Sequence, residues 1–215
     1  MPTRPQLPGY VWDSRLGGSG RYRIVKANGK LGRIISAKEI QRDLTVISNA
    51  SAERFGLMAA DAVGGRITAA ELQLAMQSQL KDLYNANAAL ARGGWSKMGP
   101  VEWGRNGQIL RGEYRYLSAF AQEIADGTLT EAQAAARAKL YVGKAYSRYW
   151  AENELMQKGG GATESRWIDT GDKSECQDCF DLAAMGWVPI GDHGTVPGAG
   201  DTACLGHCRC QIDYR

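Results

Sequence analysis

The sequence predicts a mainly α protein with a four-helix body, an extended N-terminal arm and a small β-rich C-terminal module. Apolar residues recur with a helical period between residues 36 and 158. All five cysteines and both histidines fall within residues 176–215. Basic residues dominate the beginning of the chain and acidic residues dominate its end. We therefore expect an extended basic arm over residues 1–35, a helical domain over 36–158 and a cysteine-rich module over 162–215.

The charge of the chain is unevenly distributed, although the formal net value is only +3. Residues 1–35 contain seven basic residues and one acidic residue, residues 36–161 contain fifteen and thirteen, and residues 162–215 contain four and nine. The three parts therefore carry +6, +2 and −5. A hydrophobic fraction of 44% with 23% charged residues is ordinary for a globular protein and argues against general disorder.

No apolar stretch predicts export or a membrane span. The first residues lack the apolar core of a signal peptide, and no apolar run approaches the roughly 20 residues that cross a bilayer. We expect the protein to be kept, at least initially, in a reducing cytoplasm. Clustered cysteines in that compartment are more often metal ligands or redox groups than structural disulfides.

The arm is expected to be extended and to need a partner. Prolines at positions 2, 5 and 8 fix φ and remove backbone donors, which favours extended backbone. The pattern around Tyr22–Val25 and Leu31–Ile35 predicts two strands that turn at Asn28-Gly29. Such an arm buries little surface of its own, so we expect it to become ordered against another molecule.

Capping boxes predict where the first two helices begin. One helix is expected from Ser36 to Gly64, with a break near Ser48-Asn49, and a second from Thr68 to Gly93. The two capping pairs are Ser36 with Glu39 and Thr68 with Glu71. The apolar stripe of the second helix is Leu72, Met76, Leu80 and Leu83.

Two more helices follow a glycine-rich loop that is expected over residues 93–107. The third helix closes at Gly127, and the fourth opens at Thr128 with Glu131 and stops at Lys158-Gly159. Small residues on the inner face of the fourth helix permit close approach of its neighbours. The stripe of the third helix is Leu110, Tyr114, Leu117, Ala121 and Ile124.

A flexible joint at Gly159–Gly161 precedes the C-terminal module, where no helical period survives. Short apolar pieces alternate there with Gly and Asp, which predicts small strands and turns. A segment with so few apolar anchors needs an additional constraint to fold. The apolar pieces are Trp167-Ile168, Trp187–Ile190 and Gln211-Ile212.

No pattern predicts an active site. The chain has no nucleophile elbow, no P-loop and no dinucleotide-binding fingerprint after a strand, so we expect no enzymatic activity. His193 is interpreted as a solvated loop histidine. Four aromatic residues of the helical part are expected in the core rather than on a base-stacking surface: Trp95, Trp103, Tyr114 and Tyr116.

The cysteines have the spacing of a structural zinc site. Cys176 and Cys179 form a C-x2-C knuckle, and Cys204 and Cys208 follow about 25 residues later. Four protein ligands fill the coordination of a tetrahedral ion and leave no position for a substrate. We therefore predict a closed zinc site, in which Cys210 or His207 can substitute for one of the last two ligands.

Two other uses of the cysteines stay open at this point. Five thiols allow two disulfide bridges and one free cysteine if the protein is released from the cell. A redox function of the C-x2-C pair is the second alternative, although the pair does not open a helix after a strand as in thioredoxin-like proteins.

The end of the chain also resembles a known family. Trp167, the C-x2-C knuckle, a loop with Gly and Pro, and a final His207-Cys208-Arg209-Cys210 before a strand resemble the C-terminal part of phage Mu F-like head morphogenesis (minor head) proteins. That family commonly ends in H-P-x-C-R-C. Leu205 stands here where the family has its histidine, which is why Cys204 is preferred as the replacement ligand.

The resemblance implies a structural protein of a tailed bacteriophage virion that acts in capsid assembly, as a minor head, head–tail connector or portal-associated protein. Its expected location is the virion, and the host cytoplasm during assembly. Its expected partners are other virion proteins (portal, major capsid or connector) and copies of itself, with no membrane contact. A zinc-containing nucleic-acid-binding protein and a phage-encoded enzyme with an undetected site are the alternatives. The residues that would reach packaged DNA are Arg4, Arg15, Arg21, Arg23, Lys26, Lys30 and Arg33.

Overall fold

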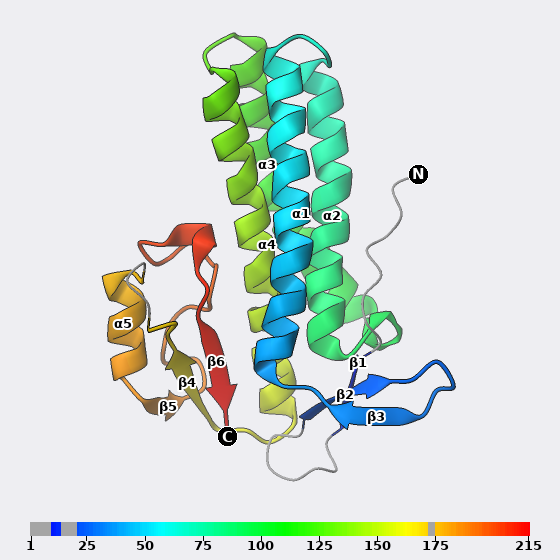
Figure 1. The fold of residues 1–215 in the computed structure, drawn as a ribbon, viewed down its shortest axis with the longest axis vertical. Helices are drawn as coiled ribbons and strands as arrows, with labels where there is room; N and C mark the ends of the chain where they lie inside the picture. The colour runs from blue at the N-terminus through cyan, green and yellow to red at the C-terminus, as the bar shows by residue number, and fades with distance from the viewer. Residues whose placement is uncertain (1–9, 14–20, 172–174) are drawn as a thin grey trace.

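The computed structural model of the chain describes residues 10–13, 21–171 and 175–215. Four long antiparallel helices form the body, with one small sheet at its base and a second small sheet at its side (Figure 1). The predicted mainly α fold with a β-containing C-terminal module is therefore confirmed. No helix in the described ranges is long and apolar enough to cross a membrane. The long helices are α1 (Ala37–Val63), α2 (Ala69–Arg92), α3 (Pro100–Ala125) and α4 (Glu131–Gly159).

Local capping explains where the helices begin. Ser36 and Thr68 cap α1 and α2 through the two predicted capping boxes. The predicted start of α4 at Thr128 is wrong, because Thr130 caps α4 together with Gln133. The Thr128 hydroxyl instead donates to the Glu123 carbonyl at 2.9 Å and so closes the end of α3.

Two helical segments are longer than the sequence predicts. Helix α1 runs through Ser48-Asn49 without the expected break. Helix α3 begins at Pro100, inside the segment expected to be a loop, and the Glu102 carboxylate accepts a 2.9 Å hydrogen bond from the Gly99 N–H at its start. Only a short 3-10 turn, η2 (Trp95–Lys97), lies between α2 and α3. The glycines of α3 lower its intrinsic propensity, and packing against α2 outweighs that effect.

The upper core lies where α4 packs along both α1 and α2, and α2 packs along α3 (Figure 1). Fully buried apolar side chains from all four helices fill it. Helices α3 and α4 meet through longer side chains, such as Phe120 with Tyr141 at 6.0 Å between ring centroids. Representative members of this core are Phe55, Leu72, Leu80, Leu117, Phe120 and Ala138.

The expected burial of the aromatic residues near the α2–α3 connection is only partly correct. Trp103 is 41% exposed and Tyr116 is 64% exposed, so both lie at the surface. Trp95 is half-buried and stacks on Trp103 with 6.0 Å between ring centroids. Tyr114 is half-buried, and its hydroxyl donates to the Gln77 carbonyl at 3.1 Å.

A buried ion cluster joins the lower halves of α2, α3 and α4. The carboxylate of Glu152 is fully buried and accepts hydrogen bonds from three guanidinium groups. Arg92 lies 3.0 Å away, Arg105 2.6 Å and Arg148 2.7 Å. Arg148 also donates to Asn106 at 3.1 Å. A buried carboxylate with several donors fixes the relative position of the three helices that supply them.

The described part of the arm forms a small antiparallel sheet at the base of the body, in the order β1-β2-β3. Strands β2 and β3 form the predicted pair around Asn28-Gly29. Arg4 and Arg15, like all of residues 1–9 and 14–20, lie outside the described residues. The strands are β1 (Tyr10–Asp13), β2 (Arg21–Val25) and β3 (Leu31–Ile34).

The C-terminal module contains a second antiparallel sheet, in the order β5-β4-β6, and a short helix. The helix corrects the expectation that only strands and turns follow Gly161. It spans eight residues, which is too short for a helical period to be recognised in the sequence. The elements are β4 (Glu164–Ile168), α5 (Gln177–Ala184), β5 (Trp187–Pro189), η3 (Leu205–His207) and β6 (Gln211–Tyr214).

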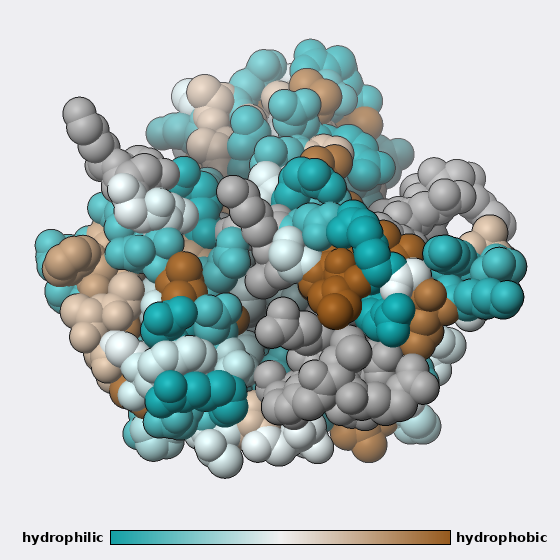
Figure 2. Space-filling model, turned by 60° about the horizontal axis from the view of Figure 1, so that its bottom comes forward, coloured by the Kyte–Doolittle hydropathy of each residue, from teal (hydrophilic) through white to brown (hydrophobic). Residues whose placement is uncertain are grey.

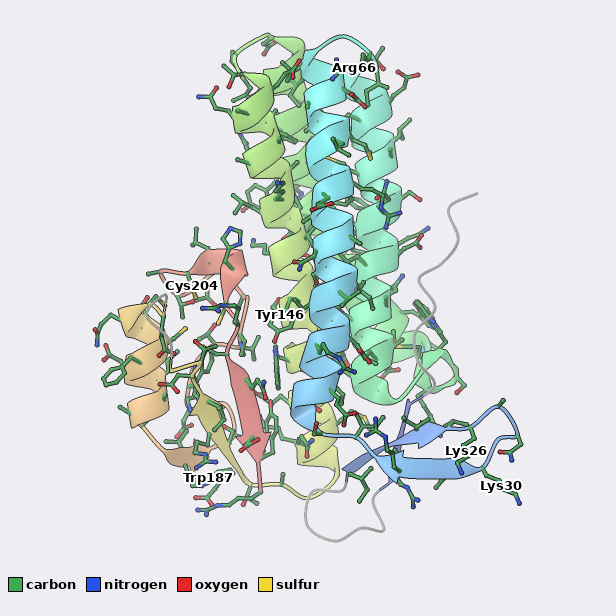
Figure 3. All side chains as sticks on the ribbon, in the orientation of Figure 1. Lys26, Lys30, Arg66, Tyr146, Trp187 and Cys204 are labelled. Atoms are coloured by element: carbon green, nitrogen blue, oxygen red, sulfur yellow. The ribbon has the colours of Figure 1, made fainter. Side chains whose placement is uncertain are left out.

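The module packs against α4 through a close approach of two backbones. Gly143 of α4 faces Gly206 of η3, and a Cβ added at Gly206 would lie 2.9 Å from the Gly143 Cα. Tyr146 of α4 points towards the module (Figure 3), and its hydroxyl donates to the Cys210 carbonyl at 3.4 Å. A single buried cluster contains side chains from the lower body and from the module. The two parts are therefore joined by a continuous apolar core.

Gly143→Ala is expected to loosen this contact. The added methyl group would overlap the Gly206 carbonyl, and neither backbone can move aside without displacing its element. We expect the free energy of unfolding to fall by about 1–3 kcal/mol, as measured by urea denaturation. Gly112→Ala in α3 is the matched control, because its Cβ meets no atom within 4 Å. It should raise stability by up to about 1 kcal/mol, and equal effects of the two variants would contradict the proposed contact.

Glu152→Gln should lower the free energy of unfolding more than the same change at a surface position. Among the described residues, Glu152 is the only carboxylate that forms an ion pair with Arg105 or Arg148. Its replacement leaves buried positive charge without compensation. We expect a loss of about 3–5 kcal/mol in urea denaturation. Glu154→Gln provides the comparison, since Glu154 pairs with the half-exposed Lys158 at 3.4 Å. That variant should lose less than about 1 kcal/mol.

Candidate metal centre

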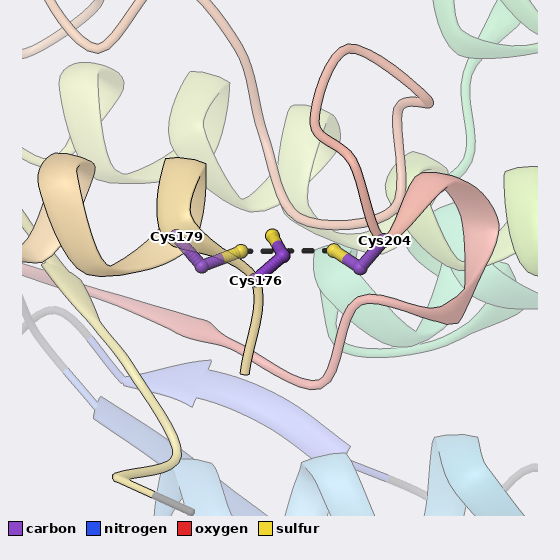
Figure 4. A group of neighbouring side chains, drawn as sticks. All are labelled: Cys176, Cys179 and Cys204. Carbon is purple, nitrogen blue, oxygen red and sulfur yellow. Dashed lines mark hydrogen bonds between the residues drawn. The ribbon is translucent and has the colours of Figure 1, made fainter. Parts of the chain in front are cut away.

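The first two cysteines are brought together by the start of α5. Cys176 immediately precedes the helix, and Cys179 lies in its first turn. The N–H groups of Cys179 and Phe180 both donate to the Cys176 carbonyl, at 3.1 and 3.2 Å. This turn directs both sulfur atoms to the same side of the chain (Figure 4).

The second pair flanks the η3 turn, which packs on α4. The His207 N–H donates to the Cys204 carbonyl at 2.9 Å, so the turn closes between Cys204 and Cys208. Leu205 adopts a positive φ of 51° within this turn. The Ala203 N–H donates to the Asp178 carboxylate of α5 at 2.7 Å. This hydrogen bond holds the η3 region against the C-x2-C knuckle.

The five cysteines converge into two groups that share one sulfur. Cys176, Cys179 and Cys204 form one group, and Cys179, Cys208 and Cys210 form the other, with all ligand atoms of a group within 4.8 Å of one another. The Cys179 sulfur lies 3.7 Å from the sulfur of Cys204 and 3.7 Å from that of Cys208. All five are free thiols in the structure. These cysteines could therefore hold a metal ion around Cys179.

The cluster combines buried and partly accessible sulfurs. Cys179, Cys208 and Cys210 are buried, whereas Cys176 and Cys204 are half-buried. The Thr202 hydroxyl lies 3.2 Å from the Cys204 sulfur. Such surroundings restrict the access of water to a bound ion and favour a site that serves folding over one that serves catalysis.

Mutual hydrogen bonds and burial give the thiols unequal acidities. A hydrogen bond from the Cys210 thiol lowers the pKa of Cys208 to about 6. The pKa of Cys210 is raised, mainly by its hydrogen bond to Cys208 and secondly by burial. Burial raises the pKa of Cys179, and raises that of Cys204 to about 11. The cysteines with a raised pKa keep their protons at neutral pH, so binding of a metal ion to their thiolate forms would release protons.

The two histidines do not join the cysteines. His207 is exposed and belongs to neither group, whereas Cys210, the other substitute considered, belongs to the second group. The interpretation of His193 as a solvated residue is wrong, because it is only 8% exposed. Its Nδ1 lies 3.2 Å from the Ser165 hydroxyl, and burial lowers its pKa. The turn that carries it is packed against β4, a long-range contact that the local sequence does not indicate.

Sequence reasoning missed the side chains that surround the cluster. Trp167 of β4 is 1% exposed, and its indole N–H has no hydrogen-bond partner. The sequence indicates Trp167 through the apolar character of its strand and through the resemblance to the minor head proteins, but its spacing does not indicate a position beside the thiols.

No protein-family model, characterised protein or solved structure significantly matches this chain. The resemblance to the phage minor head proteins therefore stays a prediction.

Binding of Co²⁺ should identify the ligands, because thiolate-to-cobalt charge-transfer bands report the number of sulfurs bound. Cys179→Ser should abolish these bands, since Cys179 belongs to both groups. Cys176→Ser should weaken them, and Cys210→Ser should leave them unchanged if the ligands are the four cysteines predicted from the sequence. An unchanged spectrum in the Cys179→Ser protein would contradict a metal centre at this position.

Proposed function

We propose that this chain is a non-enzymatic structural component of a tailed bacteriophage virion, a minor head or connector protein whose C-terminal module is folded around one zinc ion. The observation that carries the proposal is the position of the cysteine cluster. It lies in a core that the module shares with the helical body, and the sulfurs of each group lie within 4.8 Å of one another. A metal there would join the C-x2-C knuckle to the η3 region within the module.

Zinc is the metal that suits the cluster best. A tetrahedral ion with Zn–S bonds of about 2.3 Å separates its sulfur ligands by about 3.8 Å. The two sulfur–sulfur distances from Cys179 are each 3.7 Å. A set of four thiolates is also the donor set of closed structural zinc sites, whereas catalytic sites keep a position for water.

The assembly role is supported by the resemblance of the C-terminal module to minor head proteins and by the separation of charge along the chain. We infer contacts with portal, capsid or connector proteins and with further copies of the chain, within the virion or in the host cytoplasm during assembly. A nucleic-acid-binding role for the module is less favoured, because its formal charge of −5 has the wrong sign for phosphates.

Elemental analysis tests the zinc assignment. Protein purified under reducing conditions should contain one zinc per chain. Removing it with a chelator should change the tryptophan fluorescence, because Trp150 and Trp167 lie in the core shared by the body and the module. Far-ultraviolet circular dichroism should keep most of its helical amplitude, since the upper core contains no cysteine. Protein without zinc but with the same fluorescence and stability would overturn the assignment.

Analysis of purified particles tests the assembly role. Tailed particles produced by the genome that encodes this chain should contain it at a fixed copy number per particle. A reconstruction should place it at the head interior, the portal or the connector. Its absence from intact purified particles, with the protein present in the lysate, would overturn the role in the virion.

A further inference from the structure

The chain exposes two surfaces of opposite charge on opposite sides of its helical body. The β2–β3 hairpin projects from the base of the body on one side, and the C-terminal module lies on the other (Figure 1). Residues 21–34 of the hairpin contain five basic residues and no acidic residue, and residues 162–215 of the module carry a formal charge of −5. The body separates the two surfaces, so they cannot meet within one molecule.

The tip of the hairpin presents two lysines. Lys26 and Lys30 flank its turn, where the Lys26 N–H donates to the Lys30 carbonyl at 2.9 Å. Both are exposed and lie at the far end of the hairpin (Figure 3). No acidic residue among the described parts of the chain forms an ion pair with either lysine. The hairpin turn therefore presents two lysines, unpaired within the described parts of the chain, at its end away from the body.

The module presents a helix face with a complementary character. Phe180 of α5 is 55% exposed, and Met185 just after the helix is 45% exposed. Asp181 is exposed between Phe180 and Met185 around the helix axis and accepts a hydrogen bond from Gln177, whereas Asp178 lies on the far side from Phe180 and accepts from the Ala203 N–H. Nothing in the described chain covers this face, because β4 and β6 lie between α5 and α4 (Figure 1).

The space-filling view shows both surfaces together. Apolar residues reach the left edge of the molecule over α5, and hydrophilic residues gather at the outer end of the hairpin on the right (Figure 2). An exposed aromatic side chain and a methionine with Asp181 between them have the composition of an apolar interface centre with a charged group at its rim. Lys26 and Lys30 of the hairpin tip supply the opposite charge.

We propose that the α5 face binds the β2–β3 hairpin tip of a second copy of this chain. Each copy carries both halves of the contact, so the interface is heterologous and its repetition generates a ring or a filament. The ion pairs lie at the surface, and the association weakens as salt screens them. This inference specifies a partner for the assembly role proposed above, but it does not depend on the presence of the chain in particles.

Two one-sided variants test the proposal. Lys26→Glu/Lys30→Glu alters only the hairpin, and Phe180→Glu alters only the α5 face. Sedimentation velocity at low salt should show assemblies larger than a dimer for the wild-type chain and monomers for each variant, with affinity lowered on the order of tenfold or more. An equimolar mixture of the variants should form a dimer and stop there. One intact hairpin meets one intact α5 face in that dimer, and the altered surfaces, both acidic, repel one another.

Matched controls carry the same chemical changes at other exposed positions. Lys81→Glu/Lys97→Glu alters the net charge equally, and Leu74→Glu removes an apolar side chain that is 67% exposed on α2. Both controls should assemble like the wild-type chain.

Three results would overturn the proposal: a wild-type chain that stays monomeric at every salt and protein concentration, variants that assemble normally, or a mixture that remains monomeric. A hairpin variant that loses only binding to duplex DNA would identify the lysines as phosphate ligands and would also overturn it. If the chain is absent from particles while the mixture still forms dimers, the virion role fails and the self-association stands.

Discussion

The lower face of α4 carries more aromatic surface than the other three helices cover. Tyr146, Tyr149 and Trp150 project there, and Trp150 packs edge-on against both tyrosines. All three belong to a buried cluster that includes three cysteines and two strand residues of the C-terminal module. Exposure of such a surface would be costly and would promote aggregation. The module is therefore a part of the protein core and cannot be treated as an appendage.

The module in turn has too little apolar surface to fold without help. Its sheet consists of strands of three to five residues, and its only α-helix within the described range has eight. The cysteine cluster occupies the centre of this segment, where a larger domain would place aliphatic side chains. Close packing at Gly143 then seats the module on α4. The cysteine cluster, the shared core and the glycine contact thus act as one unit.

Features that depend on local sequence could be predicted, and features that depend on distant contacts could not. The capping boxes at Ser36 and Thr68 and the β2–β3 turn involve residues within a few positions of each other, and they are found where the sequence places them. The start of α4 was missed because Thr128 and Thr130 both have capping chemistry. In the structure Thr130 caps α4 with Gln133, while the Thr128 hydroxyl donates to the Glu123 carbonyl at the end of α3. The burial of His193 and the cluster around Glu152 arise between elements far apart in the chain.

The candidate site shows the same division. The cysteines and the knuckle were recognisable from type and spacing, because metal chemistry restricts both. The choice among Cys204, Cys208, Cys210 and His207 was not, since it depends on how η3 is held against α5 and α4. In the structure His207 belongs to neither cysteine group, whereas Cys208 and Cys210 lie in one group with Cys179.

The cysteine cluster also determines where the outer surface of the module points. Cys176 precedes α5 and Cys179 lies in its first turn, so the sulfur cluster fixes the orientation of this short helix. Phe180 follows Cys179 directly, and its exposed side chain is therefore positioned by the same turn that positions the ligand. A helix of eight residues is not stable alone in water. The surface proposed to bind a second copy of the chain consequently exists only while the cysteine cluster is assembled, and this couples association between copies to the folding of the module.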